Sequence, residues 1–176
     1  MPPAARDKMT ADEFFAAHIE LPFAQLIDGE LVVPMHSPKL RHQKIVQHLL
    51  LAHWRCEGAI GELILPQDMR VDDHNVFVPD LFWVPDGSVL DDGDHILSLV
   101  PPLVIEVLSP STRHHDLGRK RRGYLESGVQ EVWIIDGEAD RLTVHRADGT
   151  TSIHTETVAT PLVPGWVVEL AEVFAR

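Results

Sequence analysis

The chain has 176 residues, of which 44% are hydrophobic, and its formal net charge is −12. This length and hydrophobic content predict one domain, residues 1–176, with a sizeable core. The single cysteine, Cys56, excludes a disulfide within the monomer. The acidic balance argues against a protein that coats nucleic acid by charge alone.

The sequence carries no sign of a membrane segment. No apolar run approaches the roughly 20 residues that a membrane-spanning helix needs. The N-terminus, MPPAARDKMTADEFF, lacks the charged and then apolar pattern of a signal peptide. We therefore expect a cytoplasmic protein that makes no contact with a membrane.

The positive charges are unevenly placed along the chain. Five of the 15 Lys and Arg residues fall between residues 113 and 124, where only Asp116 opposes them: Arg113, Arg119, Lys120, Arg121 and Arg122. Such a basic segment is typical either of a solvated helix face or of a local patch that attracts phosphate. Charge alone favours neither interpretation.

The N-terminal part begins with helix and hairpin signals. A capping-box pattern at residues 10–13 predicts the start of a helix. The Asp28-Gly29 pair between two apolar segments predicts a hairpin over residues 25–33. Ser37 and Pro38 predict the N-cap and first residue of a helix that runs to about Cys56.

From Gly61 onward the pattern changes to strands. Residues 63–71 predict one strand, interrupted near Pro66. The run VFVPDLFWV at residues 76–84 predicts a second strand, in which Pro79 marks an edge, a bulge or a strand end. Residues 85–100 contain Pro85, Gly87 and the acidic Asp91, Asp92 and Asp94, which predicts an exposed loop.

The stretch LVIEVLSPSTRHHDLGRKRRGY at residues 103–124 reads as a strand, a turn and a basic helix that continues to Ser127. The strand EVWIID follows at the spacing of a crossover to a parallel neighbour. Two further Asp-Gly pairs predict a closing meander over residues 131–155, and the tail predicts a short strand and a helical turn. This order predicts an α/β (α+β) fold with a mixed sheet and helices on both faces.

Two carboxylates stand out against this pattern. Glu106 interrupts the apolar strand LVIEVL, and a buried carboxylate without a partner costs several kcal/mol. Asp80 and Glu106 each share side-chain parity with apolar residues two positions away, so both point toward apolar faces. Taken singly, Asp80 could cap a turn and Glu106 could belong to a buried ion pair. Together they favour a bound hard cation, Mg²⁺ or Mn²⁺.

Lys120 is the third candidate. Asp116, Lys120 and Tyr124 fall at i, i+4 and i+8 of the predicted helix and share one of its faces. Lys120 either forms a surface ion pair with Asp116 or points toward Glu106. The second arrangement would place an amine beside two metal-binding acids, which suits phosphodiester hydrolysis.

These residues carry a family resemblance. The sequence resembles the Uma-two family of restriction-endonuclease-like proteins, within the PD-(D/E)xK nuclease superfamily. The resemblance implies a single nuclease-like domain over residues 1–176, with a mixed central sheet flanked by helices and with N-terminal hairpin and C-terminal meander additions. The matching segments cover almost the whole chain in order: MTADEFF, LIDGELVV, SPKLRHQKIV, VPDLFWV, PPLVIEVLSPSTRHHDLGRKRRGYLESGVQEVWIID and PLVPGWVVELAEVF.

The resemblance also implies roles for individual residues. Pro79 and Asp80 match the "PD" of the motif, Glu106 matches its second acid, and the backbone carbonyl of Val107 joins the metal shell. Leu108 stands where the motif has its lysine. The resemblance implies that Lys120, from the following helix, takes the role of that lysine.

Three further residues are candidates for an outer shell of the site: Glu30, His42 and Tyr124. The sequence slightly favours a structural explanation for the first two, Glu30 as a surface acid beside the hairpin and His42 as a polar residue early in a helix. His114 and His115 lack a metal-binding partner pattern such as HExxH or CxxC, so we interpret them as loop residues.

We therefore expect an endonuclease that hydrolyses phosphodiester bonds in nucleic acid with Mg²⁺ or Mn²⁺, and with Asp80, Glu106 and Lys120 as its catalytic residues. The alternative is a catalytically inactive nuclease fold that acts as a dimeric DNA-binding or interaction module. Hydrolysis of another phosphate ester is a third possibility. Apolar residues in the hairpin and the terminal strands predict a homodimer.

Overall fold

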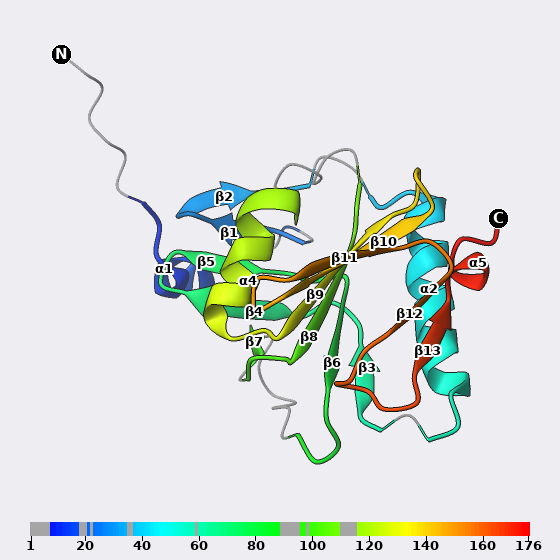
Figure 1. Ribbon diagram of the computed structural model, residues 1–176. Coiled ribbons are helices and arrows are strands. Elements are labelled where there is room, and N and C mark those ends of the chain that lie inside the picture. The colour runs from blue at the N-terminus through cyan, green and yellow to red at the C-terminus, as the bar shows by residue number, and fades with distance from the viewer. Residues whose placement is uncertain are drawn as a thin grey trace.

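The structure is a computed structural model, and it describes residues 8–17, 21, 23–34, 37–58, 60–88, 96–97, 99–109 and 116–176. Of residues 96, 97, 116 and 117 it describes the backbone. Strands form two larger sheets and one two-stranded sheet, with helices packed around them (Figure 1).

The larger sheet has six strands in the order β11-β10-β9-β8-β6-β3. Strands β8 and β9 are parallel, and the other neighbouring pairs are antiparallel. The sheet is therefore mixed, as the sequence predicts, and the C-terminal meander is part of it. Its strands are β3 (Glu62–Ile64), β6 (Leu81–Val84), β8 (Leu103–Val107), β9 (Glu131–Asp136), β10 (Arg141–Arg146) and β11 (Thr151–His154).

The second sheet has five strands in the order β2-β1-β5-β4-β7. The predicted hairpin forms two of them, and both residues of its turn have positive φ, 53° for Asp28 and 75° for Gly29. Positive φ at both central residues is the geometry of a type I′ turn. The strands are β1 (Gln25–Ile27), β2 (Glu30–Val32), β4 (Asp68–Asp72), β5 (Asn75–Phe77) and β7 (Ile96–Leu97).

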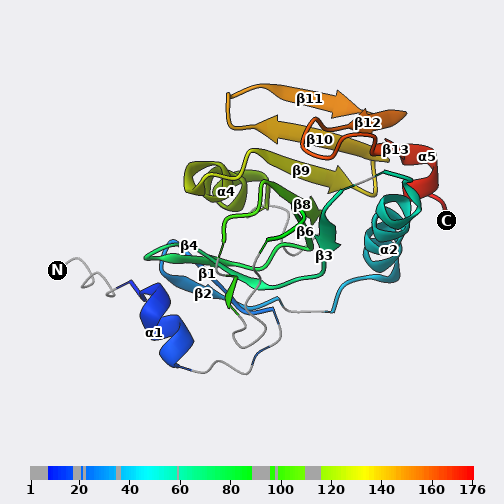
Figure 2. The ribbon, with the colours of Figure 1, turned by 90° about the horizontal axis from the view of Figure 1, so that it is seen from below.

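The helices cover both faces of the six-stranded sheet, as Figure 2 shows. Helices α2 (Leu40–Arg55) and α5 (Leu170–Val173) pack on one face with β12 (Thr157–Ala159) and β13 (Val167–Glu169). On the other face lie α4 (Arg121–Ser127) and the five-stranded sheet, which share a second hydrophobic cluster. The remaining helix, α1 (Ala11–Ala16), begins with the predicted capping box of Thr10 and Glu13.

Two predicted strands are each divided at a proline. The run at residues 76–84 forms β5 and β6, which belong to different sheets, and residues 78–80 cross between them. Pro79 has no N–H to donate to a ladder, so the chain leaves one sheet there and enters the other. Pro66 separates β3 from β4 in the same way, so the prediction of one strand over residues 63–71 is wrong.

Three other boundaries differ from the prediction. Helix α2 begins at Leu40 with Lys39 as its N-cap, so the predicted cap at Ser37 is wrong. The basic helix opens with a π-helical turn, η1 (Asp116–Lys120), before α4. Residues 96–97 of the predicted loop form β7, parallel to β4. His114 and His115 lie outside the described residues.

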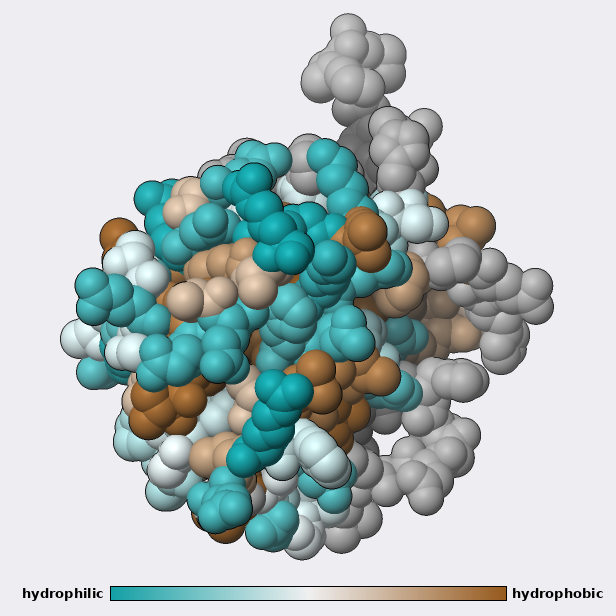
Figure 3. Space-filling view, turned by 90° about the vertical axis from the view of Figure 1, so that its right-hand side faces the viewer, coloured by the Kyte–Doolittle hydropathy of each residue, from teal (hydrophilic) through white to brown (hydrophobic). Residues whose placement is uncertain are grey.

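The surface carries several exposed apolar side chains. On the side of the molecule that carries α2 and α5, hydrophobic residues form patches among hydrophilic ones (Figure 3). Trp54 of α2 is 82% exposed, and Leu31, Ile153 and Val167 are exposed in the hairpin and the terminal strands. The homodimer stays a prediction.

In the part of the chain that the structure describes, no helix is long and apolar enough to cross a membrane.

Gly123 allows α4 to approach the five-stranded sheet closely. A Cβ atom at this position would lie 2.7 Å from the Cε2 atom of Phe77. We expect Gly123→Ala to lower the free energy of unfolding by about 1–3 kcal/mol, because the Phe77 ring must move. Urea denaturation measures the change.

Gly118→Ala is the matched control for this substitution. A Cβ atom at Gly118 meets no heavy atom within 4 Å. Alanine there should be neutral or stabilise the helix by up to about 1 kcal/mol. Equal effects of the two substitutions would contradict the packing argument.

Candidate active site

Glu106 lies on β8 at the centre of the six-stranded sheet, and its side chain is 4% exposed. The Nζ atom of Lys120 lies 2.6 Å from its Oε1 atom. The hydroxyl of Tyr124 donates a hydrogen bond to the same Oε1 atom at 2.7 Å. The fold therefore provides both a cation and a strong hydrogen bond for this buried carboxylate, as its burial requires.

The helical segment after β8 delivers both of these partners. Lys120 ends η1, and Tyr124 follows it by one turn of α4, so the two side chains lie on one helix face. The Nζ atom of Lys120 also donates to the carbonyl oxygen of Val78 at 3.4 Å. Lys120 thus connects β8 to the segment that carries Asp80. The side chain of Asp116, its alternative partner, lies outside the described residues.

Asp80 directly precedes β6 and faces Glu106. The antiparallel ladder pairs Leu81 with Ile105, so one further step of the same register places Asp80 opposite Glu106. The Asp80 Oδ2 atom accepts a hydrogen bond from the Val107 N–H at 2.7 Å, and it lies 3.1 Å from Nε2 of His42. The Asp80 side chain is 23% exposed, so the carboxylate is anchored on one side and open on the other.

A cavity of about 400 Å³ brings these residues together. Asp80, Glu106, Lys120 and His42 all line it. Tyr124 is fully buried and supports Glu106 through its hydroxyl. Much of the remaining wall is apolar and comes from Phe23, Pro34, Pro38, Val46, Leu65, Pro66 and Val78.

Glu30 is not among the residues that line this cavity, and its position in an outer shell stays a prediction. Its side chain is 74% exposed, and one of its oxygens lies 3.7 Å from Nη1 of Arg119. Glu30 thus points to solvent from β2, where it pairs with a surface arginine. The Val107 N–H binds Asp80, while the role of the Val107 carbonyl as a metal ligand stays a prediction.

Sequence reasoning missed Gln25. This residue is buried in β1, lines the cavity, and accepts a hydrogen bond from the Val78 N–H through its Oε1 atom at 3.0 Å. The signal was a polar residue directly before the apolar pair Leu26-Ile27, in a strand that is buried along its whole length. A buried amide side chain needs hydrogen-bond partners, so Gln25 was a candidate for a structural role at a polar site.

The donor set of the cavity suits a small hard cation with few protein ligands. Among the residues with described side chains, no group of three or more His, Cys, Asp and Glu could hold a metal ion. Two carboxylates nevertheless line one cavity, Asp80 from the residue before β6 and Glu106 from the adjacent strand β8. Mg²⁺ is commonly held by one or two carboxylates and keeps several waters, so Asp80 and Glu106 fit its requirements.

Comparisons with known proteins identify the fold and the family of the chain. A family model described as "Putative restriction endonuclease" (Uma2) matches residues 11–175. The crystal structure of a "putative nuclease belonging to DUF820" from Anabaena variabilis is 20% identical, with a TM-score of 0.80 over 95% of this chain and 98% of that one. A comparison with curated proteins found no match. The structural likeness confirms the predicted fold class, and the match over residues 11–175 shows that the chain belongs to the Uma2 family.

Proposed function

We propose that this protein is an endonuclease that hydrolyses phosphodiester bonds in nucleic acid with the help of Mg²⁺ or Mn²⁺. The description of the family supports a nuclease function. The observation that carries the proposal is the convergence of Asp80, Glu106 and Lys120 on one cavity. Two carboxylates and an amine in a largely apolar pocket are suited to phosphodiester hydrolysis.

Asp80 and Glu106 would hold the cation, together with the carbonyl oxygen of Val107. A divalent ion held by these residues would lower the pKa of a bound water and would offset negative charge on the phosphate. The hydrogen bond from the Val107 N–H and the contact with His42 fix the orientation of the Asp80 carboxylate. The Tyr124 hydroxyl does the same for Glu106.

Lys120 serves the reacting phosphate. Its ammonium group lines the cavity beside Glu106, where it can orient a water molecule or donate to a phosphoryl oxygen as negative charge develops. Its side chain is 3% exposed, so this charge acts in surroundings that screen it less than bulk water does. The contact with the Val78 carbonyl limits the positions that the amine can take.

Cleavage of supercoiled plasmid, branched DNA and single-stranded DNA or RNA tests the proposal. We expect wild type to cleave at least one of these in Mg²⁺ or Mn²⁺ and to leave them intact in EDTA. Asp80→Asn should reduce the rate by about a hundredfold or more, because it removes a charged metal ligand. Glu57→Gln, which changes an exposed acid just after the C-terminal end of α2, is the matched control. Equal cleavage by wild type and Asp80→Asn would refute the proposal.

The alternative is a non-cleaving module that keeps these residues as a static ion network. The short Lys120–Glu106 contact gives that alternative its support, since the pair is already satisfied without a metal. A titration with Mn²⁺, followed by electron paramagnetic resonance, separates the two. A nuclease site binds Mn²⁺ in wild type and loses it in Glu106→Gln, whereas a static network binds none in either protein.

A further inference from the structure

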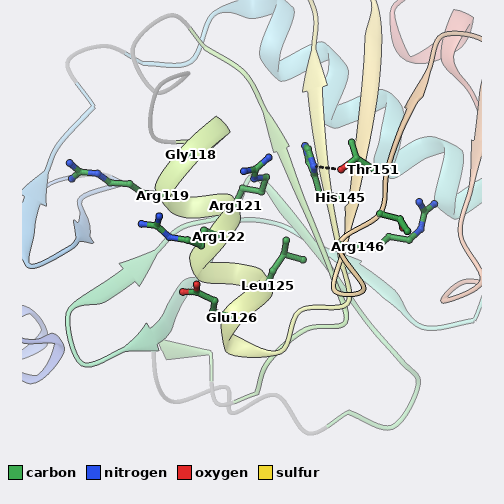
Figure 4. Close-up of a pocket in the computed structure, with 11 residues that line it drawn as sticks. Gly118, Arg119, Arg121, Arg122, Leu125, Glu126, His145, Arg146 and Thr151 are labelled. Atoms are coloured by element: carbon green, nitrogen blue, oxygen red, sulfur yellow. Dashed lines mark hydrogen bonds between the residues drawn. The ribbon is translucent and has the colours of Figure 1, made fainter.

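A second and larger cavity lies between the η1–α4 segment and the β10–β11 hairpin (Figure 4). Its volume is about 630 Å³. Arg119, Arg121 and Arg122 contribute to its wall from the helical side, and His145 and Arg146 contribute from the hairpin. In a chain with a net charge of −12, this concentration of positive side chains calls for an explanation. Glu126 is the one acidic residue in the lining that the structure describes.

Two of the four arginines are already engaged with carboxylates. Arg119 lies 3.3 Å from Oδ2 of Asp28 and points toward the β1–β2 hairpin. Arg146 donates to Glu131 at 3.0 Å and points away from α4. These two arginines therefore line the cavity, but their guanidinium groups do not face its centre.

Arg121 and Arg122 differ from them in having no such partner among the described residues. Within the described part of the chain, no carboxylate lies within ion-pair distance of either guanidinium group. Figure 4 shows Arg121 pointing across the cavity toward His145, whose Nδ1 atom lies 3.1 Å from the Thr151 hydroxyl. Arg122 lines the same cavity but points to the side of the helix on which Arg119 lies. We call the surface formed by Arg121, Arg122 and His145 the basic groove.

The local field in the basic groove is positive. Burial, and then the positive charge of Arg121, lower the pKa of His145 below its usual value. A negative group placed between Arg121 and His145 would relieve that repulsion. Arginine is suited to a phosphate in particular, because its planar fork can donate two parallel hydrogen bonds to phosphate oxygens.

We propose that the basic groove binds phosphate groups in the backbone of the nucleic-acid strand that enters the catalytic cavity. This inference rests on the proposed nuclease function. The connection between the two sites is covalent and short, because Arg121 follows Lys120 directly in the chain. Lys120 lines the catalytic cavity and Arg121 lines the groove, so one helical segment would hold the strand at two places.

The test measures binding without cleavage. The probes are a fluorescein-labelled single strand of about 20 nucleotides and the corresponding duplex, both long enough to span the two sites. The fluorescence anisotropy of each probe is recorded in EDTA at several salt concentrations. The groove variant is Arg121→Ala/Arg122→Ala. The control, Arg55→Ala/Arg176→Ala, removes the same charge from two exposed arginines that have no ion pair among the described residues.

We expect the groove variant to weaken binding by about tenfold. For the duplex, the slope of the logarithm of the association constant against the logarithm of the salt concentration should become less negative by about 1.8. Each phosphate that an arginine neutralises contributes about −0.9 to that slope. The control should change affinity by less than about twofold. Arg122→Glu alone, at an exposed position, should also weaken binding and serves if the double variant fails to fold. Equal reductions in affinity for the groove variant and the control would overturn the proposal.

Inorganic phosphate separates a backbone site from a site for a free anion. Arg121 faces His145 from the helix, Arg122 and Glu126 line the same cavity without pointing at it, and Arg146 and Thr151 belong to its own hairpin. Millimolar phosphate should raise the pKa of His145, as measured by NMR, in wild type and not in the groove variant. Phosphate binding as tight as that of the oligonucleotide would identify a free anion as the ligand and overturn the proposal.

The outcome is also independent of the catalytic proposal. Binding in EDTA is measured without the divalent ion that cleavage requires, so the two proposals can fail separately. If wild type binds through the groove but cleaves nothing, the catalytic proposal fails alone. If it cleaves with a metal while the groove variant binds like the control, the groove proposal fails alone.

Discussion

Lys120→Met should lower the free energy of unfolding by about 3–5 kcal/mol, because it leaves Glu106 charged and buried without its cation. Both side chains are almost completely buried, and the Nζ–Oε1 distance is 2.6 Å. The Tyr124 hydroxyl is a remaining donor to Glu106, but it carries no charge. Urea denaturation at neutral pH measures the loss, and nuclease assays should show activity falling with it.

The double variant Lys120→Met/Glu106→Leu tests the cause of that loss. A buried ion pair replaced by apolar side chains of similar volume is often as stable as the original, so the double variant should recover most of the lost stability. It should remain inactive, because both proposed catalytic residues are gone. Lys44→Met, on α2, should change stability by less than about 0.5 kcal/mol. A double variant less stable than Lys120→Met would contradict this account.

Trp133→Ala should destabilise the protein by about 3–5 kcal/mol through the cavity it leaves in the core. Trp133 lies fully buried on β9, and its ring stacks on that of Trp166 with centroids 5.3 Å apart and planes 12° from parallel. Its indole N–H also donates to Glu131 at 3.0 Å. The substitution thus removes a large apolar volume, a ring contact and a hydrogen bond.

Trp54→Ala is the matched control, because the same substitution at an 82% exposed position on α2 leaves no cavity. Its effect on unfolding should stay within about 0.5 kcal/mol. Near-ultraviolet circular dichroism should change strongly for Trp133→Ala, which breaks the stacked pair, and weakly for Trp54→Ala. Comparable losses of stability in the two variants would show that the stacked pair contributes little.

Elements with strong local signals could be predicted from the sequence. The capping box at Thr10, the Asp28-Gly29 hairpin and the meander after β9 depend on residues close together in the chain, and each of these forms. The sheet to which a strand belongs depends on distant partners. Side-chain parity gave no warning that Pro66 and Pro79 pass the chain from one sheet to the other.

The candidate site shows the same division. Glu106 was conspicuous because a carboxylate in a buried strand needs a partner, and the structure places Lys120 beside it. The local pattern left Glu30 ambiguous, because residues beside a hairpin turn can face either the interior or solvent, and its side chain is 74% exposed. Gln25 was missed because its partner, the Val78 N–H, lies 53 residues away and becomes visible only in the folded chain.

Residues 78–80, which cross between the two larger sheets, also line the catalytic cavity through Val78 and Asp80. Gln25 of the five-stranded sheet accepts a hydrogen bond from the Val78 N–H, and Asp80 accepts one from the Val107 N–H of the six-stranded sheet. A small separation of the sheets would pull Asp80 out of register with Glu106 while leaving the hydrogen bonds within each sheet intact. On gradual warming, catalysis should therefore disappear at a lower temperature than the circular dichroism signal of the strands.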